Sequence, residues 1–196
     1  TTRFIGDEMN GGNKYKTLVI AKNNKIYAAP HNPYYSYVLE IDPVTDPDNP
    51  IVREIGDQLS GAFKYSTSVL ADNGKIYAAP YNAEQVLEID PVTNPSDPTT
   101  RLIGTNLGSG IYKYRTSVLA GNGKIYAAPY KATQVLEIDP ATLTTKLIGM
   151  DLGDGYKYFT SVLAGNGKIY ASPYGSNAKQ VLEINPYAAR DNDGND

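Results

Sequence analysis

The chain has 196 residues, no cysteine and no tryptophan, and its 18 basic and 21 acidic residues give a net charge of −3. The absence of cysteine excludes disulfides, thiolate metal sites and cysteine nucleophiles. The basic residues form no run and the apolar runs span only a few residues, so neither a nucleic-acid partner nor a membrane-spanning helix of about 20 residues is expected.

The first predicted element is TTRFIG, residues 1–6, which matches TTRLIG at 99–104. Four short runs then recur along the chain, shown here by the third copy: YRTSVLA at 114–120, KIYAAP at 124–129, QVLEID at 134–139 and TTKLIG at 144–149. All four are rich in Val, Ile, Leu, Thr and Tyr, which favours β-strands. Helical periodicity is missing throughout.

Two turn signals connect these runs. Asn122-Gly123 separates the first run from the second, which predicts a two-residue type I′ hairpin because both positions favour positive φ. Asp139-Pro140 follows the third run, and this pair fits the first two positions of a type I turn. The last copy has Asn185-Pro186 instead, so side-chain hydrogen bonding should matter more there than charge.

The copies repeat at a regular interval. The tyrosine of KIYAAP falls at residues 27, 77, 126 and 170, in steps of 50, 49 and 44 residues. This period and four antiparallel strands per repeat predict a β-propeller. We therefore expect one domain over residues 1–187, with repeats 7–56, 57–104, 105–149 and 150–187 plus 1–6, followed by an acidic, flexible tail at 188–196.

The final copy supplies only three strands and ends at VLEINP, residues 181–186. The opening strand 1–6 is therefore expected to complete the last blade and to close a ring of four four-stranded blades, which would also remove exposed sheet edges. Two alternatives stay open. The chain could be part of a larger ring, or the opening strand could complete the last blade of a neighbouring molecule and so build a head-to-tail assembly.

The stretch KIYAAPYNAEQVLEIDPVTNPSDPTTRLIG, residues 75–104, resembles the YVTN-type β-propeller repeats of surface-layer and other cell-surface proteins, and more broadly the NHL and kelch-like propellers. The resemblance rests on the K-I-Y strand, the V-L-E-I-D strand, the Asp-Pro-x-Thr turn and the closing Ile-Gly. The longer repeats and the Ala-Ala-Pro after the tyrosine depart from that pattern. The resemblance implies a non-enzymatic, often extracellular, scaffold or interaction module without a particular ligand.

Catalytic chemistry has little support in the sequence. His31 is the only histidine and stands where the other copies have tyrosine, so a simple loop residue is the preferred interpretation. The carboxylate pairs, such as Glu88 with Asp90, recur in the repeats and are expected to pair across the hairpin with lysines such as Lys75. We expect no enzyme and no catalytic residue; an active site in the central opening is the third-ranked hypothesis.

The tail DNDGND resembles the acidic, glycine-containing calcium loops and makes Asp191, Asp193 and Asp196 candidate ligands. It lacks the distal glutamate of an EF-hand, so a solvated tail is preferred. No cofactor is expected otherwise.

Two sets of loops would emerge on one face of a propeller and carry the candidate ligand-binding residues. The first set consists of the pairs that precede the innermost strands: Lys14 with Tyr15, Lys64 with Tyr65, Lys113 with Tyr114, and Lys157 with Tyr158. The second set consists of the tyrosines that follow or lie near the prolines after the second strands: Tyr34, Tyr81, Tyr130 and Tyr174.

Tyrosine offers a rigid flat surface and a hydroxyl, which suits a protein or glycan ligand. The alternative is that these tyrosines only pack between blades. The sequence thus favours an extracellular or cell-surface recognition module, with a structural subunit held by strand exchange as the alternative.

Overall fold

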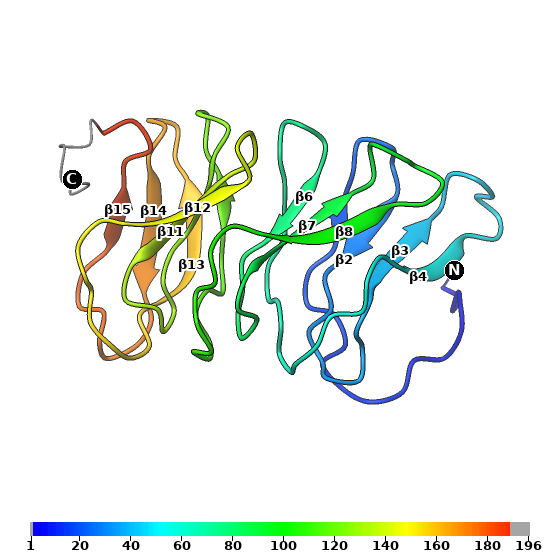
Figure 1. Ribbon diagram of the computed structural model, residues 1–196, viewed down its shortest axis with the longest axis horizontal. Coiled ribbons are helices and arrows are strands. Elements are labelled where there is room, and N and C mark those ends of the chain that lie inside the picture. The colour runs from blue at the N-terminus through cyan, green and yellow to red at the C-terminus, as the bar shows by residue number, and fades with distance from the viewer. Residues whose placement is uncertain (1, 189–196) are drawn as a thin grey trace.

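The computed structural model describes residues 2–188, and this range is all-β: its fifteen strands form four antiparallel sheets without a helix (Figure 1). It follows that no helix in this range could span a membrane. The predicted propeller blades are confirmed. Three sheets have four strands, and the last has three.

Each blade is a meander of strands in chain order. Blade one contains β1 (Val19–Ile20), β2 (Ile26–Ala28), β3 (Val38–Asp42) and β4 (Ile51–Ile55). Blade two contains β5 (Val69–Leu70), β6 (Ile76–Ala78), β7 (Val86–Asp90) and β8 (Thr99–Ile103). Blade three contains β9 (Val118–Leu119), β10 (Ile125–Ala127), β11 (Val135–Asp139) and β12 (Thr144–Ile148). Blade four contains β13 (Tyr158–Leu163), β14 (Ile169–Pro173) and β15 (Leu182–Ile184).

The blades pack face to face, so both faces of an internal sheet are apolar. Along β7, Leu87 lies in the core between blades one and two, whereas its neighbour Val86 lies in the core between blades two and three. Alternate side chains of a strand point to opposite faces. This explains why VLEID is a nearly continuous apolar run in which even Val86, Leu87 and Ile89 are fully buried.

The hairpin between the first two strands differs from the predicted type I′ turn. In blade two, Gly74 has a φ of 81°, but Asn73 does not have a positive φ. Gly74 donates to the carbonyl of Ala71 at 3.0 Å, so a turn followed by a left-handed glycine joins the strands. Asn73 is used for its side chain instead: it donates to the Tyr77 hydroxyl and accepts from the Lys75 amide.

The Asp-Pro turn is built by side-chain hydrogen bonds. Asp90 accepts from the amides of Val92 and Thr93, each at 2.9 Å, and from the Thr93 hydroxyl at 2.7 Å. Burial opposes ionisation here, yet these bonds and Lys75 hold the pKa of Asp90 well below its usual range. Asn185 accepts from the Tyr187 amide in the last blade, which confirms that the hydrogen bonding persists without the charge.

The predicted carboxylate–lysine pairs are present, and in blades one to three their glutamates are buried. Glu88 is 1% exposed and accepts from the Tyr77 hydroxyl at 2.8 Å and from Arg101 at 2.6 Å. Lys75 lies 3.3 Å from Glu88 and 2.7 Å from Asp90. Since neighbouring blades cover both faces of the sheet, the pair belongs to a buried network.

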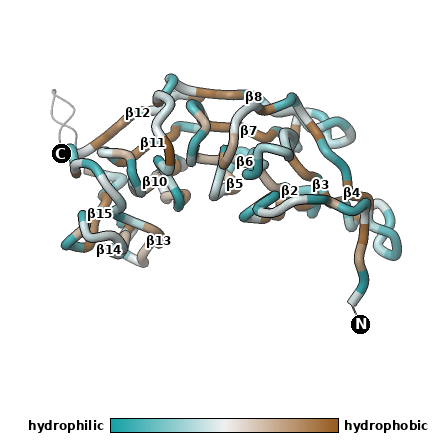
Figure 2. Tube along the Cα trace, turned by 90° about the horizontal axis from the view of Figure 1, so that it is seen from below, coloured by the Kyte–Doolittle hydropathy of each residue, from teal (hydrophilic) through white to brown (hydrophobic). Residues whose placement is uncertain are grey.

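The structure does not show the predicted closure of the ring by residues 1–6. The four blades form an open arc, with β8 and β12 on its outer curve and blades one and four at its two ends (Figure 2). Within residues 2–188, blade four has three strands, and β15 pairs only with β14.

The opening segment instead lies against blade one. A Cβ atom placed on Gly6 would be 2.7 Å from Val52 of β4. Gly56 and Gly104 approach the fourth strands of blades two and three in the same manner, at Thr100 and Thr145. The opening segment thus occupies the place that the fourth strand of a preceding blade would take, but without strand partners.

Candidate functional site

The lysine–tyrosine pairs of blades two to four are buried. Lys64 is 1% exposed and donates to the carbonyls of Asn32 at 3.0 Å and Tyr35 at 2.9 Å. The equivalent lysines, Lys113 and Lys157, donate to loop carbonyls of glycines. Burial lowers the pKa of all three lysines.

The tyrosines of these pairs likewise bond within the protein. Each hydroxyl donates to the carbonyl of a glutamine just before the third strand: Tyr65 to Gln85, Tyr114 to Gln134, and Tyr158 to Gln180. Tyr15 in blade one is less buried and reaches the Tyr37 carbonyl at 3.4 Å, while Lys14 donates to Gly11. These eight residues therefore hold the loops in place from within the protein.

The second predicted set is divided by exposure. Tyr81 and Tyr130 are 6% and 8% exposed, whereas Tyr34 and Tyr174 are 84% and 62% exposed. The rings of Tyr81 and Tyr130 stack at 6.3 Å, and Tyr130 lies 6.1 Å from Tyr174. Tyr34 lies at the far end of the arc in blade one, in a loop where its amide bonds to Asn32.

His31 takes the first place in this row of rings. It is 1% exposed, its Nδ1 lies 2.7 Å from the Tyr65 carbonyl, and its ring lies 5.6 Å from Tyr81. Burial, assisted by the cations of Lys16, Lys64 and Arg115, lowers the pKa of His31 to about 4. The imidazole is thus neutral near pH 7 and packs as an aromatic ring, with no carboxylate partner among residues 2–188.

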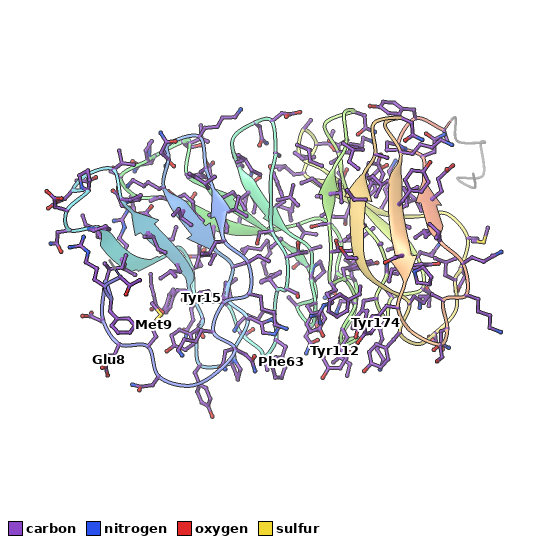
Figure 3. The ribbon with its side chains drawn as sticks, turned by 180° about the vertical axis from the view of Figure 1, so that it is seen from behind. Glu8, Met9, Tyr15, Phe63, Tyr112 and Tyr174 are labelled. Atoms are coloured by element: carbon purple, nitrogen blue, oxygen red, sulfur yellow. The ribbon has the colours of Figure 1, made fainter. Side chains whose placement is uncertain are left out.

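A second row of aromatic residues covers these buried rings. It comprises the residues just before the buried lysines, and we define the aromatic rim as this row together with Tyr174: Phe63, Tyr112, Tyr156 and Tyr174. All four are partly or largely exposed. Figure 3 shows Phe63, Tyr112 and Tyr174 along one edge of the arc.

Ring contacts join the rim to the buried row beneath it. Tyr112 lies 5.0 Å from Tyr81 and 6.3 Å from Tyr156, and Tyr156 lies 5.0 Å from Tyr130. Lys131 places its ammonium group 5.0 Å from the Tyr156 ring. Such contacts at 4.5–7 Å are favourable aromatic geometry, so the rim is a supported surface with cations close to its rings.

Two rim residues have an unfavourable backbone conformation. The φ angles of Phe63 and Tyr112 are 52° and 60°. A bulky residue in this left-handed region is an outlier. Blade one has Asn13 at the same place with a φ of 53°, and blade four instead puts Gly155 at positive φ just before Tyr156.

Residues 2–188 show no metal centre. The buried carboxylates, such as Glu88, are bonded near the opposite end of each blade, beside the Asn-Gly turns. No group of three His, Asp or Glu side chains in the described part of the chain could hold a metal ion. The predicted calcium ligands Asp191, Asp193 and Asp196 lie outside the described residues.

Comparisons with known proteins identify the fold. No protein-family model and no curated protein matches the chain. Among solved structures, it is similar to the virginiamycin B lyase of Staphylococcus aureus, with a TM-score of 0.60 and 11% identity over 94% of this chain and 62% of the lyase. It is also similar to PorZ, a surface component of the type-IX secretion system of Porphyromonas gingivalis, with a TM-score of 0.61 and 12% identity over 94% of this chain and 28% of PorZ.

A third similar structure is the extracellular domain of the two-component system BT4673 from B. thetaiotaomicron, with a TM-score of 0.60 and 14% identity over 81% of this chain and 19% of that chain. The chain thus spans less than two thirds of each of these proteins. At these identities the similarity shows the propeller fold alone. It does not single out the YVTN, NHL or kelch-like type, and both an enzyme and surface components share the fold.

The aromatic residues before the lysines were not among the site residues predicted from the sequence. Sequence reasoning also missed Lys16 and Arg115, which follow the Lys-Tyr pairs of blades one and three. The signal was in the repeats: this position is Lys16, Ser66, Arg115 and Phe159 in the four copies, whereas its neighbours are nearly constant.

Proposed function

We propose that this chain is a non-catalytic recognition module that acts outside the cell or at the cell surface, and that the aromatic rim binds a glycan. The observation that carries this proposal is the left-handed backbone of Phe63 and Tyr112. A non-glycine residue in this region costs about 1–2 kcal/mol. Folding alone would be served better by asparagine, as at Asn13, or by glycine.

The same side chain type is retained although the local backbone differs between blades. Phe63 and Tyr112 are themselves left-handed, whereas Tyr156 follows a left-handed glycine. The aromatic ring is common to blades two, three and four, whereas the backbone conformation of the residue that carries it is not. We infer that function requires the ring. Its partial exposure allows contact with a ligand.

A row of flat rings with hydroxyl groups fits a saccharide, whose C–H faces stack on aromatic rings and whose hydroxyls form hydrogen bonds. Lys131 at the rim adds a donor beside Tyr112 and Tyr156. We propose no catalytic role because His31 is buried and bonded to a backbone carbonyl. The extracellular or cell-surface location is supported by the surface components among the proteins of similar fold.

A glycan array tests the proposal. The test variant is Phe63→Asn combined with Tyr112→Asn, because asparagine tolerates the left-handed backbone and Asn13 already adopts it. The control is Tyr187→Asn, an exposed tyrosine near the opposite, Asn-Gly end of the blades. We expect wild type and control to bind the same glycans, and the double variant to lose at least about tenfold in affinity, or about 1.4 kcal/mol.

Both variants should keep the β-sheet circular dichroism spectrum of the wild type. Unchanged glycan affinity in the folded double variant would contradict the role of the rim. Wild-type protein that binds no glycan would overturn the glycan assignment and leave contact with a protein surface as the use of the rim.

A second candidate function is that of a structural subunit joined to its neighbours by strand exchange. The observation in its favour is that the two ends of the arc are complementary: among the residues that the structure describes, blade one carries a segment without a strand partner, and blade four has an unpaired strand edge. Within residues 2–188, the segment 2–6 has no strand partner and the outer edge of β15 is unpaired. Phe4 on this segment is fully exposed. Val162 and Val181 of blade four are 63% and 61% exposed, on a face that internal blades bury.

The repeats give the register of such an exchange. In blade two, Arg101 lies opposite Glu88 and Leu102 lies opposite Leu87. The equivalent pairs in an exchanged blade are Arg3 with Glu183 and Phe4 with Leu182. Arg3 would then form the ion pair that Arg101 forms with its buried glutamate.

Cysteine cross-linking with light scattering tests this candidate, since the chain has no cysteine of its own. Opposite residues of antiparallel strands are close enough to form a disulfide after small adjustments. Phe4→Cys with Leu182→Cys should cross-link between chains, whereas the control Phe4→Cys with Ser176→Cys should not. A mass that stays near 21.3 kDa at all concentrations, without cross-linking between chains, would refute strand exchange.

A further inference from the structure

The residue after each Lys-Tyr pair distinguishes the blades from one another. It is Lys16, Ser66, Arg115 and Phe159 in blades one to four. Since the residues around it are nearly the same in each copy, the fold does not require a particular side chain there. The two cations thus occupy one repeat position in blades one and three, with the small side chain of Ser66 between them in the array.

Lys16 and Arg115 both lie close to the buried ring of Tyr81. The Lys16 ammonium is 5.6 Å from the centre of that ring. Burial raises the pKa of Tyr81, and the nearby Arg115 cation opposes this. Burial, and after it the charge of Arg115, lowers the pKa of Lys16. The two cations therefore influence each other across one tyrosine.

Neither cation has an acidic partner. Within residues 2–188, no salt bridge involves Lys16 or Arg115, whereas Lys25, Lys75, Lys124 and Lys168 are all paired. Lys64 adds a third, buried cation beside His31. Although the net charge is −3, this local positive site forms no salt bridge with a carboxylate of residues 2–188. An anion from outside the chain would stabilise these neighbouring like charges.

Arg115 is also held in a defined orientation. Its guanidinium carbon lies 3.5 Å from the centre of the Phe159 ring, so the planar group is stacked. Arg115 donates a hydrogen bond to the Tyr81 side chain, but none of its N–H groups donates to a backbone carbonyl or carboxylate of the described residues. A fixed guanidinium whose remaining N–H groups have no such acceptor matches the two oxygens of a carboxylate.

The cation site is continuous with the rim. Phe159, on which Arg115 stacks, lies 4.7 Å from Tyr174 of the rim, and Arg115 lies 5.8 Å from Tyr130. We propose that Lys16 and Arg115 bind the carboxylate of an acidic saccharide whose sugar rings lie on the aromatic rim. This inference rests on the proposed glycan-binding function and specifies its ligand class.

The test compares tri-galacturonic acid with its methyl ester, because the two share their sugar rings and differ in charge. Affinity is measured by titration calorimetry for the wild type and for Lys16→Gln, Arg115→Gln and the double variant. We expect the wild type to prefer the acid by roughly tenfold or more, as for charge-assisted hydrogen bonds. Each single variant should reduce this preference, and the double variant should abolish it.

Arg115→Lys serves as the matched control, since it keeps the charge but not the planar fork, and it should retain part of the preference. Inorganic phosphate is added as a competitor. If it competes as strongly as free galacturonate, the site binds oxyanions in general and the assignment to a carboxylate is overturned.

If the wild type binds the acid and the ester equally, and if Phe63→Asn with Tyr112→Asn abolishes this binding, the carboxylate site is overturned and the rim proposal stands. An acid preference that survives in the Lys16→Gln/Arg115→Gln variant would also overturn it. Binding of neither probe would refute the acidic-saccharide assignment, and the glycan array would then decide the rim separately.

Discussion

The substitution Glu88→Gln tests whether the buried network of each blade stabilises the fold. Glu88 is 1% exposed and accepts hydrogen bonds from the Tyr77 hydroxyl, Arg101 and Lys75. The amide of glutamine has nearly the same shape but carries no charge, and its NH₂ group would face these donors. The change therefore removes at least one charge-assisted hydrogen bond and leaves a donor facing a donor.

The expected loss of unfolding free energy is about 3 kcal/mol, because a hydrogen bond to a charged group contributes about 1.5–3 kcal/mol and a buried charge without its partner adds to the loss. Tyr77→Phe removes only the hydroxyl and should lose less, about 2 kcal/mol. Urea denaturation followed by circular dichroism measures both changes.

Blade four provides the matched control. Glu183 accepts from the Tyr170 hydroxyl at 2.8 Å and from Lys168 at 2.5 Å, as Glu88 accepts from its own partners, but its side chain is 45% exposed. Exposed ion pairs contribute little, so Glu183→Gln should leave the denaturation midpoint close to that of the wild type. The comparison requires protein diluted until its mass is that of one chain, since strand exchange would bury Glu183.

Equal effects of Glu88→Gln and Glu183→Gln in the single chain would refute the reasoning, because burial would then not govern the strength of the network.

Three further predictions concern other features of the fold. In the unfolded chain His31 takes up a proton near pH 6.5, whereas in the folded protein its pKa is lowered to about 4. The stability of the wild type should therefore fall relative to that of His31→Tyr as the pH drops from 6.5 to 4. Thermal melts at several pH values measure this difference. Gly56→Ala should lower the free energy of unfolding by about 1–3 kcal/mol more than Gly61→Ala does. Both glycines have positive φ, but only at Gly56 would the new Cβ lie 2.3 Å from an atom of Thr100. Equal losses in the two variants would contradict this clash. Lys64→Met should lower the free energy of unfolding by about 2 kcal/mol, because the backbone carbonyls of Asn32 and Tyr35 lose their donor. An unchanged urea midpoint would contradict this prediction and show that water replaces the ammonium group.

The blades could be predicted because the necessary signals are local. Strand-forming runs and the Asn-Gly and Asp-Pro turns each lie within one repeat, and the interval between Tyr27, Tyr77 and Tyr126 is read directly from the sequence. The turn type was wrong because Asn73 supplies its side chain to Tyr77, four residues further along the chain, and residue preferences for turns do not include that contact.

The closure of the ring depends on the angle between blades, which no single repeat encodes. The sequence match between TTRFIG and TTRLIG predicts a strand of the fourth type at residues 1–6, but residues 2–6 form no strand in the structure. In the structure the segment packs on blade one through Gly6 and Val52, as Gly56 packs on Thr100. The match therefore identified the surface on which the segment packs and not its strand partner.

Exposure was the hardest property to predict. Tyr81 and Tyr174 occupy the same repeat position, yet one is 6% and the other 62% exposed. Tyr81 is covered because blade three adds Tyr112 and Tyr130 beside it, whereas blade four has no following blade. The same residue type at the same position thus has a different environment at the end of the arc.

The repeats themselves separate folding from function within this one chain. Positions that are the same in every copy, such as Tyr77 and Glu88, are bonded to each other and secure each blade. The position of Lys16 and Arg115 differs between copies, and within residues 2–188 these two side chains form no salt bridge and adjoin the rim. Because blades two and three both have a neighbouring blade on each side, packing alone does not explain why one has Ser66 and the other Arg115 at this position. A ligand that spans several blades, with a charged group at one place and sugar rings along the rim, would explain this difference.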